Sequence, residues 1–289
     1  MRFMDEIVET EGVVRIGAVS YLNARPLVEG LEMCRDVAVS FDVPSRLLGA
    51  LLEERVDLAL APIVDAVESS APLVVAPVGC IASDGPTRSV KLFSRTPIGE
   101  IRRVVTDPDS KTSVALAKTL LARRFECEAT FERAAGTIDG GGAIDADAVL
   151  LIGDKVERRP PAKVEFPFDL DLGEAWRDWT GLPFVYAAWV CLASRADEPT
   201  VRRGCDLLDR TRRQNESRLA WIASKRAAEH GWGADAARAY LTKTIRTELG
   251  EREKKAIERF VVEAAAAGAT AQAGSIRWAR VGSAMSCPD

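Results

Sequence analysis

The sequence predicts an α/β fold with a parallel sheet, and three observations support this class. A short apolar run rich in β-branched residues, 14–19, gives way to a polar segment, as a buried strand does at its carboxyl end. Strand and helix patterns then alternate up to Pro62, which implies parallel strands joined by right-handed crossovers. The 289 residues, 47% of them hydrophobic and 28% charged, are enough for a packed core and for two domains.

The first predicted strand leads into the segment that carries the most chemistry. Ser20, Tyr21, Asn23 and Arg25 place a hydroxyl, a phenol, an amide and a guanidinium within six residues, ahead of Pro26, which a first helical turn tolerates. Ligands of α/β sheets bind beyond the carboxyl ends of strands, so a site is expected here. The alternative is an ordinary strand-turn-helix junction, in which Asn23 caps the helix and Arg25 is solvated.

The next elements continue the alternation. A strand over 37–43 is followed by a helix from Pro44 with a leucine-rich face, and then by a short buried strand over 57–62. Two strand-like pieces flank a turn at 83–86, and the second of them, 89–94, alternates polar and apolar residues. This turn brings hydroxyls and backbone amides together, although it can equally be structural.

A predicted anion-binding segment follows the next strand of the chain. A strand over 101–106 precedes the sequence Ser-Lys-Thr-Ser, 110–113, at the start of an amphipathic helix that runs to about Phe125. Free amides, hydroxyls and the positive end of a helix dipole suit a carboxylate or a phosphate. The alternative is plain capping of the helix by Ser110. The P-loop pattern is missing, so the segment is not a nucleotide site of that type.

The remaining elements are a buried strand that ends in Gly153-Asp154, a short helix, an aromatic strand and a helical C-terminal part. The Gly/Asp-rich loop at 136–142 is too irregular for a dinucleotide fingerprint. The predicted ranges are 148–154 for the first strand, 172–179 for the helix closed by Gly181, 184–192 for the strand with Tyr186 and Trp189, and 201–224, 234–244 and 251–267 for the last helices.

The composition argues against several classes of partner. A formal net charge of −4 without a basic stripe makes nucleic acid an unexpected partner. The acidic start has no apolar signal-peptide core and no uncharged run is long enough for a membrane span, so a cytoplasmic protein is expected. The only histidine, His230, excludes an imidazole-based metal centre, and six scattered cysteines are expected to be reduced and structural. Nothing in the sequence indicates an oligomeric state.

Five segments in this order resemble the chorismate dehydratases of the futalosine pathway of menaquinone biosynthesis. The resemblance covers roughly 13–268 and is carried by R-I-G-A-V-S-Y-L-N-A-R-P-L (15–27), C-I-A-S-D-G-P-T-R-S-V-K-L-F-S (80–94), D-P-D-S-K-T-S (107–113), A-V-L-L-I-G-D (148–154) and W-T-G-L-P-F-V-Y-A-A-W (179–189). It implies a periplasmic-binding-protein-like type II fold, with two α/β lobes around a ligand cleft. One lobe is expected to hold 13–94 plus 190–289 and the other 95–189.

The resemblance also implies a reaction and its catalytic residues. Dehydration and aromatisation of chorismate to 3-[(1-carboxyvinyl)oxy]benzoate is a carbon-oxygen lyase reaction that needs neither a metal nor a cofactor. Asn23 and Ser89 are the expected catalytic residues. Our hypothesis is that the enolpyruvyl carboxylate of the substrate takes the proton, held in place by these two side chains.

Further residues are expected to bind the substrate. The helix start at Lys111 is expected to hold the second carboxylate, with Arg25 as a weaker candidate, while aromatic rings wall the substrate ring. Asp154 is not expected to touch a dianion unless it orients another donor. The expected substrate-binding set is Ser20, Tyr21, Arg25, Ser83, Lys111, Thr112, Ser113, Gly153, Tyr186 and Trp189.

Three alternatives remain beside this interpretation, one of which is a family member that binds the substrate but no longer turns it over. The related lyase that forms 1,4-dihydroxy-6-naphthoate is expected to use a histidine base in the second lobe, whereas His230 falls in the C-terminal helices. A solute-binding protein without catalysis can use the same two-lobed fold, and the lack of a signal peptide argues against it.

Overall fold

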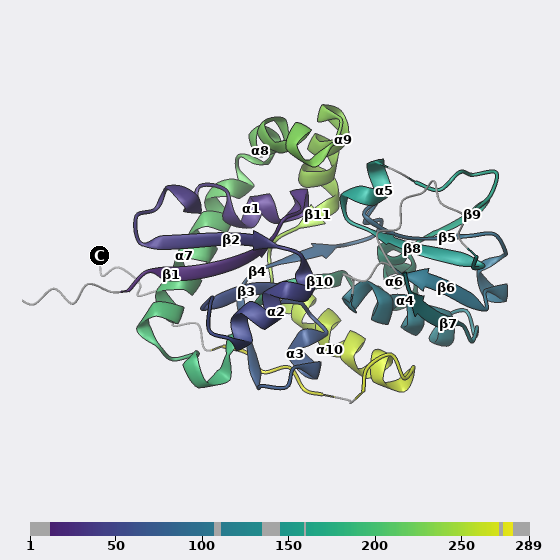
Figure 1. The fold of residues 1–289 in the computed structure, drawn as a ribbon, viewed down its shortest axis with the longest axis horizontal. Helices are drawn as coiled ribbons and strands as arrows, with labels where there is room; N and C mark the ends of the chain where they lie inside the picture. Colours follow the sequence, from purple (N-terminus) through teal and green to yellow (C-terminus); the bar gives the residue numbers. More distant parts are fainter. Residues whose placement is uncertain (1–11, 107–110, 135–144, 159, 272–273, 280–289) are drawn as a thin grey trace, which may run out of the picture.

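Two lobes lie side by side in the computed structural model, each built on its own sheet (Figure 1). The structure describes residues 12–106, 111–134, 145–158, 160–271 and 274–279. The predicted cap Ser110 and the loop at 136–142 lie outside the described residues. Mixed sheets covered by helices confirm the predicted α/β class.

The first lobe contains a six-stranded sheet with the order β11-β4-β10-β3-β1-β2. Its strands are β1 (Val14–Val19), β2 (Val37–Asp42), β3 (Leu58–Pro62), β4 (Leu73–Ser83), β10 (Phe184–Leu192) and β11 (Ile245–Arg246). Strands β2 and β3 pair with β1 in parallel, as the alternation predicted. Strand β10 runs antiparallel between β3 and β4, so the completed sheet is mixed.

The second lobe contains a five-stranded sheet with the order β7-β6-β8-β5-β9. Its strands are β5 (Val90–Ser94), β6 (Arg103–Thr106), β7 (Thr130–Arg133), β8 (Ala148–Ile152) and β9 (Phe168–Asp171). Strand β6 is parallel to β7 and β8, while β5 is antiparallel to β8 and β9. The short strands β7, β9 and β11 were not predicted, because two to four residues carry little periodic signal.

The expected lobe boundaries need correction at both crossings. Strand β5 falls within 13–94 but forms ladder hydrogen bonds in the second sheet. Most of β10 falls within 95–189, yet it pairs with β3 and β4 of the first sheet. The chain therefore changes lobes before residue 90 and again between residues 171 and 184. The sheet that a strand joins depends on its pairing with strands far away in the sequence, and a local sequence pattern does not predict that pairing.

The helices pack against the two sheets (Figure 1), and the C-terminal helix contacts both β10 of the first sheet and the long helix of the second lobe. They are α1 (Arg25–Val28), α2 (Pro44–Leu52), α3 (Asp65–Glu68), α4 (Lys111–Arg123), α5 (Asp154–Arg158), α6 (Leu172–Thr180), α7 (Pro199–Glu216), α8 (Leu219–Arg226), α9 (Ala234–Ala239) and α10 (Glu251–Ala266). The predicted helix over 201–224 is two helices, α7 and α8, and the buried Asn215 near the end of α7 donates to the carbonyls of Pro26 and Glu29. The predicted helix over 234–244 ends as a π-helical turn, Tyr240–Thr244.

Aromatic contacts join α6, which follows the last strand of the second sheet, to β10 of the first sheet. Trp176 of α6 meets Phe184 of β10 and Phe260 of α10 edge to face, with ring centroids 5.5 and 5.9 Å apart. Four of the cysteines are buried free thiols, as expected, whereas Cys34 is exposed. Within the described part of the chain, the helices are too short or too polar to cross a membrane.

Candidate functional site

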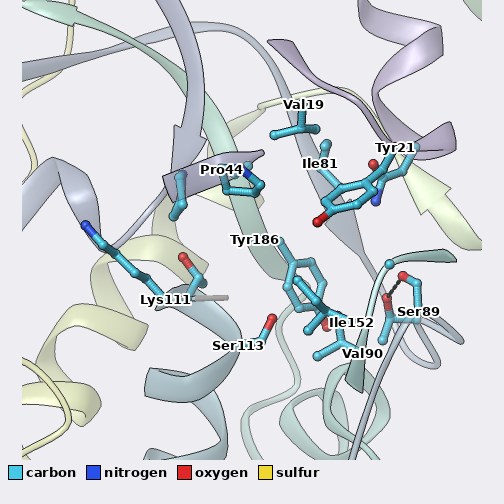
Figure 2. Close-up of a pocket in the computed structure, with 16 residues that line it drawn as sticks. Val19, Tyr21, Pro44, Ile81, Ser89, Val90, Lys111, Ser113, Ile152 and Tyr186 are labelled. Carbon is cyan, nitrogen blue, oxygen red and sulfur yellow. Dashed lines mark hydrogen bonds between the residues drawn. The ribbon is translucent and has the colours of Figure 1, made fainter. Parts of the chain in front are cut away.

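A cavity opens between the two lobes and encloses about 590 Å³ of empty space, its mouth included. Figure 2 shows Tyr21 and Ile81 on one side, Ser113 and Ile152 on the opposite side, and the ring of Tyr186 between them. The lining consists of Val19, Tyr21, Asn23, Pro44, Pro62, Ile81, Thr87, Ser89, Val90, Lys111, Thr112, Ser113, Ile152, Gly153, Tyr186 and Ala187.

A chain of hydrogen bonds joins the expected catalytic residues. The Asn23 Nδ2 atom donates to the Tyr240 hydroxyl at 3.2 Å, and that hydroxyl donates to Ser89 Oγ at 2.7 Å. The hydroxyls of Ser89 and Thr87 lie 3.2 Å apart, as the dashed line in Figure 2 marks. Among the described residues, the buried Asn23 Oδ1 atom has no hydrogen-bond partner. The cavity therefore presents an amide and hydroxyls whose orientations are largely set.

The backbone around Ser89 is fixed by the second lobe. The N–H groups of Thr87 and Arg88 donate to the two Asp171 carboxylate oxygens at 2.9 and 2.8 Å. Arg88 has a φ of +60°, and this left-handed residue turns the chain into β5. On the other side, the Gly153 N–H donates to the Ser89 carbonyl at 2.7 Å. Ser89 is consequently held at the cavity wall by its own backbone as well as by its hydroxyl.

Gly153 allows a close approach between the lobes. It follows β8 with a φ of +64°, where a side chain is strained. A Cβ atom at this position would lie 3.4 Å from two carbon atoms of the Tyr21 ring. The glycine thus lets the aromatic ring of the first lobe pack directly on the backbone of the second.

Lys111, Thr112 and Ser113 begin α4 at the edge of the cavity. The Lys111 ammonium lies 2.7 Å from Asp65 of the first lobe, and the Thr112 hydroxyl accepts from the Val64 N–H at 3.5 Å. Burial raises the pKa of Asp65 even though the Lys111 ammonium opposes it. The first turn of the helix therefore supplies hydroxyls and amides beside a cation that already has a counter-ion.

The cavity is close to neutral. Lys111 is the one lining residue among those described that has a charged side chain, and Asp65 balances it. Burial raises the pKa of the Tyr186 and Tyr240 hydroxyls well above their usual range, so both remain protonated donors. The described residues contain no group of three or more His, Cys, Asp or Glu side chains placed to hold a metal ion. The hydrogen-bonding side chains of the described lining are therefore neutral except for Lys111.

The structure brings together eight of the twelve residues that the sequence suggested for the site. Asn23, Ser89, Tyr21, Lys111, Thr112, Ser113, Gly153 and Tyr186 all line the cavity, although they come from both halves of the chain. Of the three serines that the sequence could not separate, Ser83, Ser89 and Ser94, only Ser89 is in the described lining. Ser83 ends β4 of the first sheet and Ser94 ends β5, whereas Ser89 lies directly before β5 at the cavity.

Four suggested residues lie outside the described lining. Ser20 is exposed, and its N–H extends the ladder between β1 and β2. Ser83 is buried and donates to the Gly85 carbonyl, which closes the turn. Trp189 is fully buried opposite Leu60 in the interior of the sheet.

Arg25 is also directed away from the cavity. Its guanidinium lies over the Phe41 ring at 4.5 Å and faces Glu32 at 3.7 Å. Its Nε atom donates to His230 Nε2 at 3.4 Å. The guanidinium is thus held by groups of the first lobe, which compete with a substrate carboxylate for it.

The sequence analysis missed Tyr240, Thr87 and Asp171. Tyr240 lies in the C-terminal part of the chain, in a helical pattern that gave no functional signal. Thr87 lies within the segment 80–94 that carries part of the family resemblance. Asp171 has the sequence context of an ordinary helix cap. His230 is not among the described lining residues. Its Nδ1 atom lies 3.3 Å from Asp154, which also accepts from the Trp232 indole at 2.7 Å.

The chain matches a known protein family over most of its length. A family model described as menaquinone biosynthesis matches residues 14–266. A chorismate dehydratase of Thermus thermophilus is 30% identical over 230 residues, which cover 75% of this chain and 82% of that protein.

Two solved structures share the fold. The alkanesulfonate-binding protein of Xanthomonas axonopodis pv. citri has a TM-score of 0.62 at 14% identity and covers 91% of this chain and 96% of its own. A Candida albicans protein described as having the generic periplasmic binding protein fold has a TM-score of 0.61 at 12% identity, over 91% of this chain and 92% of its own. The two-lobed fold is therefore of the periplasmic-binding-protein type, and the match over 14–266 shows that the chain belongs to the menaquinone biosynthesis family.

Proposed function

We propose that this protein is a chorismate dehydratase, which removes one water from chorismate to give 3-[(1-carboxyvinyl)oxy]benzoate. The relative of that name covers most of the chain. The observation that carries the proposal is the meeting of Asn23 and Ser89, from different lobes, on one buried hydroxyl at the wall of the cavity. Their neutral side chains suit a reaction that proceeds by orientation of the substrate.

The chemistry balances without an external reagent. The C–H bond breaks at the ring carbon that bears the enolpyruvyl ether, and its electron pair forms the last ring double bond. The C–O bond to the neighbouring hydroxyl breaks, and hydroxide leaves. The enolpyruvyl carboxylate of the substrate takes the proton, which combines with the hydroxide as water. The described lining offers no histidine or carboxylate for the task, and Lys111 is engaged with Asp65.

Asn23 and Ser89 hold the reacting end of the substrate in this scheme. Ser89 Oγ–H and the second Asn23 Nδ2–H donate to the enolpyruvyl carboxylate or the departing oxygen. Asn23 Oδ1, buried and without a partner among the described residues, accepts from the ring hydroxyl before it leaves. A substrate with a neutral hydroxyl beside a carboxylate matches this donor and acceptor set.

The ring carboxylate is assigned to the start of α4. Thr112 and Ser113 line the cavity there, and the positive end of a helix of thirteen residues favours an anion. The rings of Tyr21 and Tyr186 lie on the apolar walls, where they can cover the faces of the substrate ring.

The test is incubation of the purified protein with chorismate in the presence of a chelator. We expect loss of chorismate and appearance of a product lighter by one water, by absorbance and mass spectrometry. Asn23→Ala and Ser89→Ala should each lower kcat roughly 100-fold, the effect of removing one transition-state donor. Ser94→Ala, which removes a buried hydroxyl at the far end of β5, should keep the wild-type kcat.

A second candidate, a binding protein for a small carboxylate, is favoured by the fold shared with the alkanesulfonate-binding protein. The same incubation separates the two functions. Chorismate that is bound but not consumed, measured by calorimetry beside the turnover assay, would replace the dehydratase by a binding protein.

A further inference from the structure

We propose that Tyr240 is a positioning residue that assembles the two catalytic side chains from separate lobes, an inference that rests on the proposed dehydratase function. Tyr240 is fully buried in a π-helical turn of the C-terminal segment. It contacts Asn23 of the first lobe and Ser89 of the second, and it does not appear among the described lining residues. It therefore acts through these two residues and not on the substrate.

The Tyr240 hydroxyl plays a different part in each of its two hydrogen bonds. It has one proton, and in the structure it donates this proton to Ser89 Oγ at 2.7 Å. Tyr240 can then only accept from Asn23, at 3.2 Å, so the Nδ2 end of the amide must face it. The carbonyl end, Oδ1, is thereby turned away from Tyr240 and stays unpaired among the described residues. Tyr240 thus decides which end of the Asn23 amide meets the substrate.

The same bond prepares Ser89 as a donor. With one lone pair of Ser89 Oγ occupied by Tyr240, the serine keeps its own proton to give away. Thr87, whose hydroxyl lies 3.2 Å from Ser89, can donate to the second lone pair once the serine turns its proton to a carboxylate. Burial raises the pKa of Tyr240, so its proton stays in place across the working pH range.

Other contacts fix Tyr240 itself. The Trp232 ring stacks on it with a centroid distance of 4.6 Å and an interplanar angle of 20°. The Trp232 indole donates to Asp154, the first residue of α5, at 2.7 Å. Asp154 follows Gly153 of the cavity wall in the second lobe. Through Trp232, the position of the Tyr240 ring is therefore coupled to the second lobe as well as to the first.

The test compares Tyr240→Phe with Thr119→Val. The first removes only the bridging hydroxyl, and the second removes a buried hydroxyl that donates to the Ala115 carbonyl within α4. We expect Tyr240→Phe to lower kcat about 10- to 30-fold with KM changed less than about twofold, because both positioning hydrogen bonds of the hydroxyl are lost while the binding groups remain. Thr119→Val should leave both constants near the wild-type values.

A readout that does not depend on turnover accompanies the kinetics. The side-chain amide resonances of Asn23, assigned by their loss in Asn23→Ala, should shift in Tyr240→Phe and stay in place in Thr119→Val. A second experiment keeps Tyr240 in place and labels the protein with 3-fluorotyrosine. Because the chain has only three tyrosines, the fluorine spectrum contains few signals. Its Tyr240 fluorine signal should move in Ser89→Ala, which tests the contact even if Tyr240→Phe does not fold.

The outcomes separate the two proposals. Wild-type turnover together with an equally active Tyr240→Phe variant and unmoved Asn23 resonances would overturn the role of Tyr240 and leave the dehydratase intact. A wild-type protein that does not consume chorismate would overturn the function. The Asn23 and fluorine shifts would still decide whether Tyr240 orders the site.

Discussion

Lys111 and Asp65 form an ion pair across the cleft, with the ammonium 2.7 Å from a carboxylate oxygen that is almost fully buried. Lys111 begins α4 of the second lobe, and Asp65 begins α3 of the first. The sequence suggested Lys111 as a ligand of the second substrate carboxylate. Because its charge is already matched, the neutral donors of Thr112 and Ser113 beside it become the better candidates for that role.

The pair should therefore contribute more to stability than to binding. Lys111→Met leaves the Asp65 carboxyl buried without its counter-ion, and we expect the free energy of unfolding in urea to fall by about 3 kcal/mol at pH 7. Adding Asp65→Asn should restore a large part of this loss, because the uncompensated charge is gone. A double variant as unstable as Lys111→Met alone would contradict the coupling of the two groups.

Ser113 should affect substrate affinity through the anion site at the start of α4. We expect Ser113→Ala to raise KM for chorismate about tenfold with little change in kcat, because a hydrogen bond to a charged group is lost in the ground state and in the transition state alike. Steady-state kinetics measures both constants. A change in kcat alone would move Ser113 from carboxylate binding to the reacting end of the cavity.

Gly153 should be required for the position of Tyr21. Gly153→Val and Gly181→Val both place a side chain at a positive φ, +64° and +74°, and should lose stability by similar amounts, about 1–2 kcal/mol or more. Only at Gly153 would the new side chain meet the Tyr21 ring, since the nearest atom at Gly181 is the end of a flexible arginine. We expect KM to rise in Gly153→Val and to stay unchanged in Gly181→Val. Equal KM values in the two variants would contradict the prediction, because the packing of Tyr21 on Gly153 would then have no effect on substrate binding.

Asp57 should make stability depend on pH. Burial acts to raise the pKa of Asp57, but hydrogen bonds from the Arg15 side chain and backbone and the charge of Arg195 outweigh it and hold the pKa below the ordinary value of 3.8. A lowered folded-state pKa stabilises the protein above the unfolded-state value, and this contribution is lost as the pH falls through the folded-state pKa.

Asp57→Asn should thus lower the free energy of unfolding by about 3 kcal/mol near neutral pH. The difference from the wild type should begin to shrink below the ordinary value of 3.8 and should vanish only once the pH has fallen through the lower folded-state pKa, where the native Asp57 itself takes up a proton. Urea unfolding over a series of pH values measures it. Glu53→Gln, which removes an exposed pair with Arg55, is the control and should change little at any pH. A pH-independent loss in Asp57→Asn would mean that packing and not charge accounts for its role.

The candidate site shows what could be predicted from local sequence. Asn23 follows β1, and Lys111 begins α4, as the polar segments at strand and helix ends indicated. The elements nearest these residues begin and end within a few residues of their predicted positions, since β-branched runs, prolines and helix periodicity are local signals. The parallel pairing of β1, β2 and β3 also follows from their alternation with helices.

The remainder depended on contacts between residues that are far apart in the chain. The ladders put β5 in the second sheet and β10 in the first, and the placement of the segment before β5 brought Ser89, but neither Ser83 nor Ser94, into the described lining. The local sequence makes Arg25 a candidate substrate ligand, but in the fold its guanidinium lies over the Phe41 ring and donates to His230.

The sequence by itself determined the α/β class, the strand ends that carry polar residues and the family resemblance, because these depend on residues close together in the chain. Only the tertiary structure decided that Tyr240 meets Ser89, 151 positions away, and Asn23, 217 positions away. A hydroxyl group that is buried by packing needs a hydrogen-bond partner, and that partner can come from any part of the chain that packs beside it. The local sequence therefore does not predict which residue the partner is.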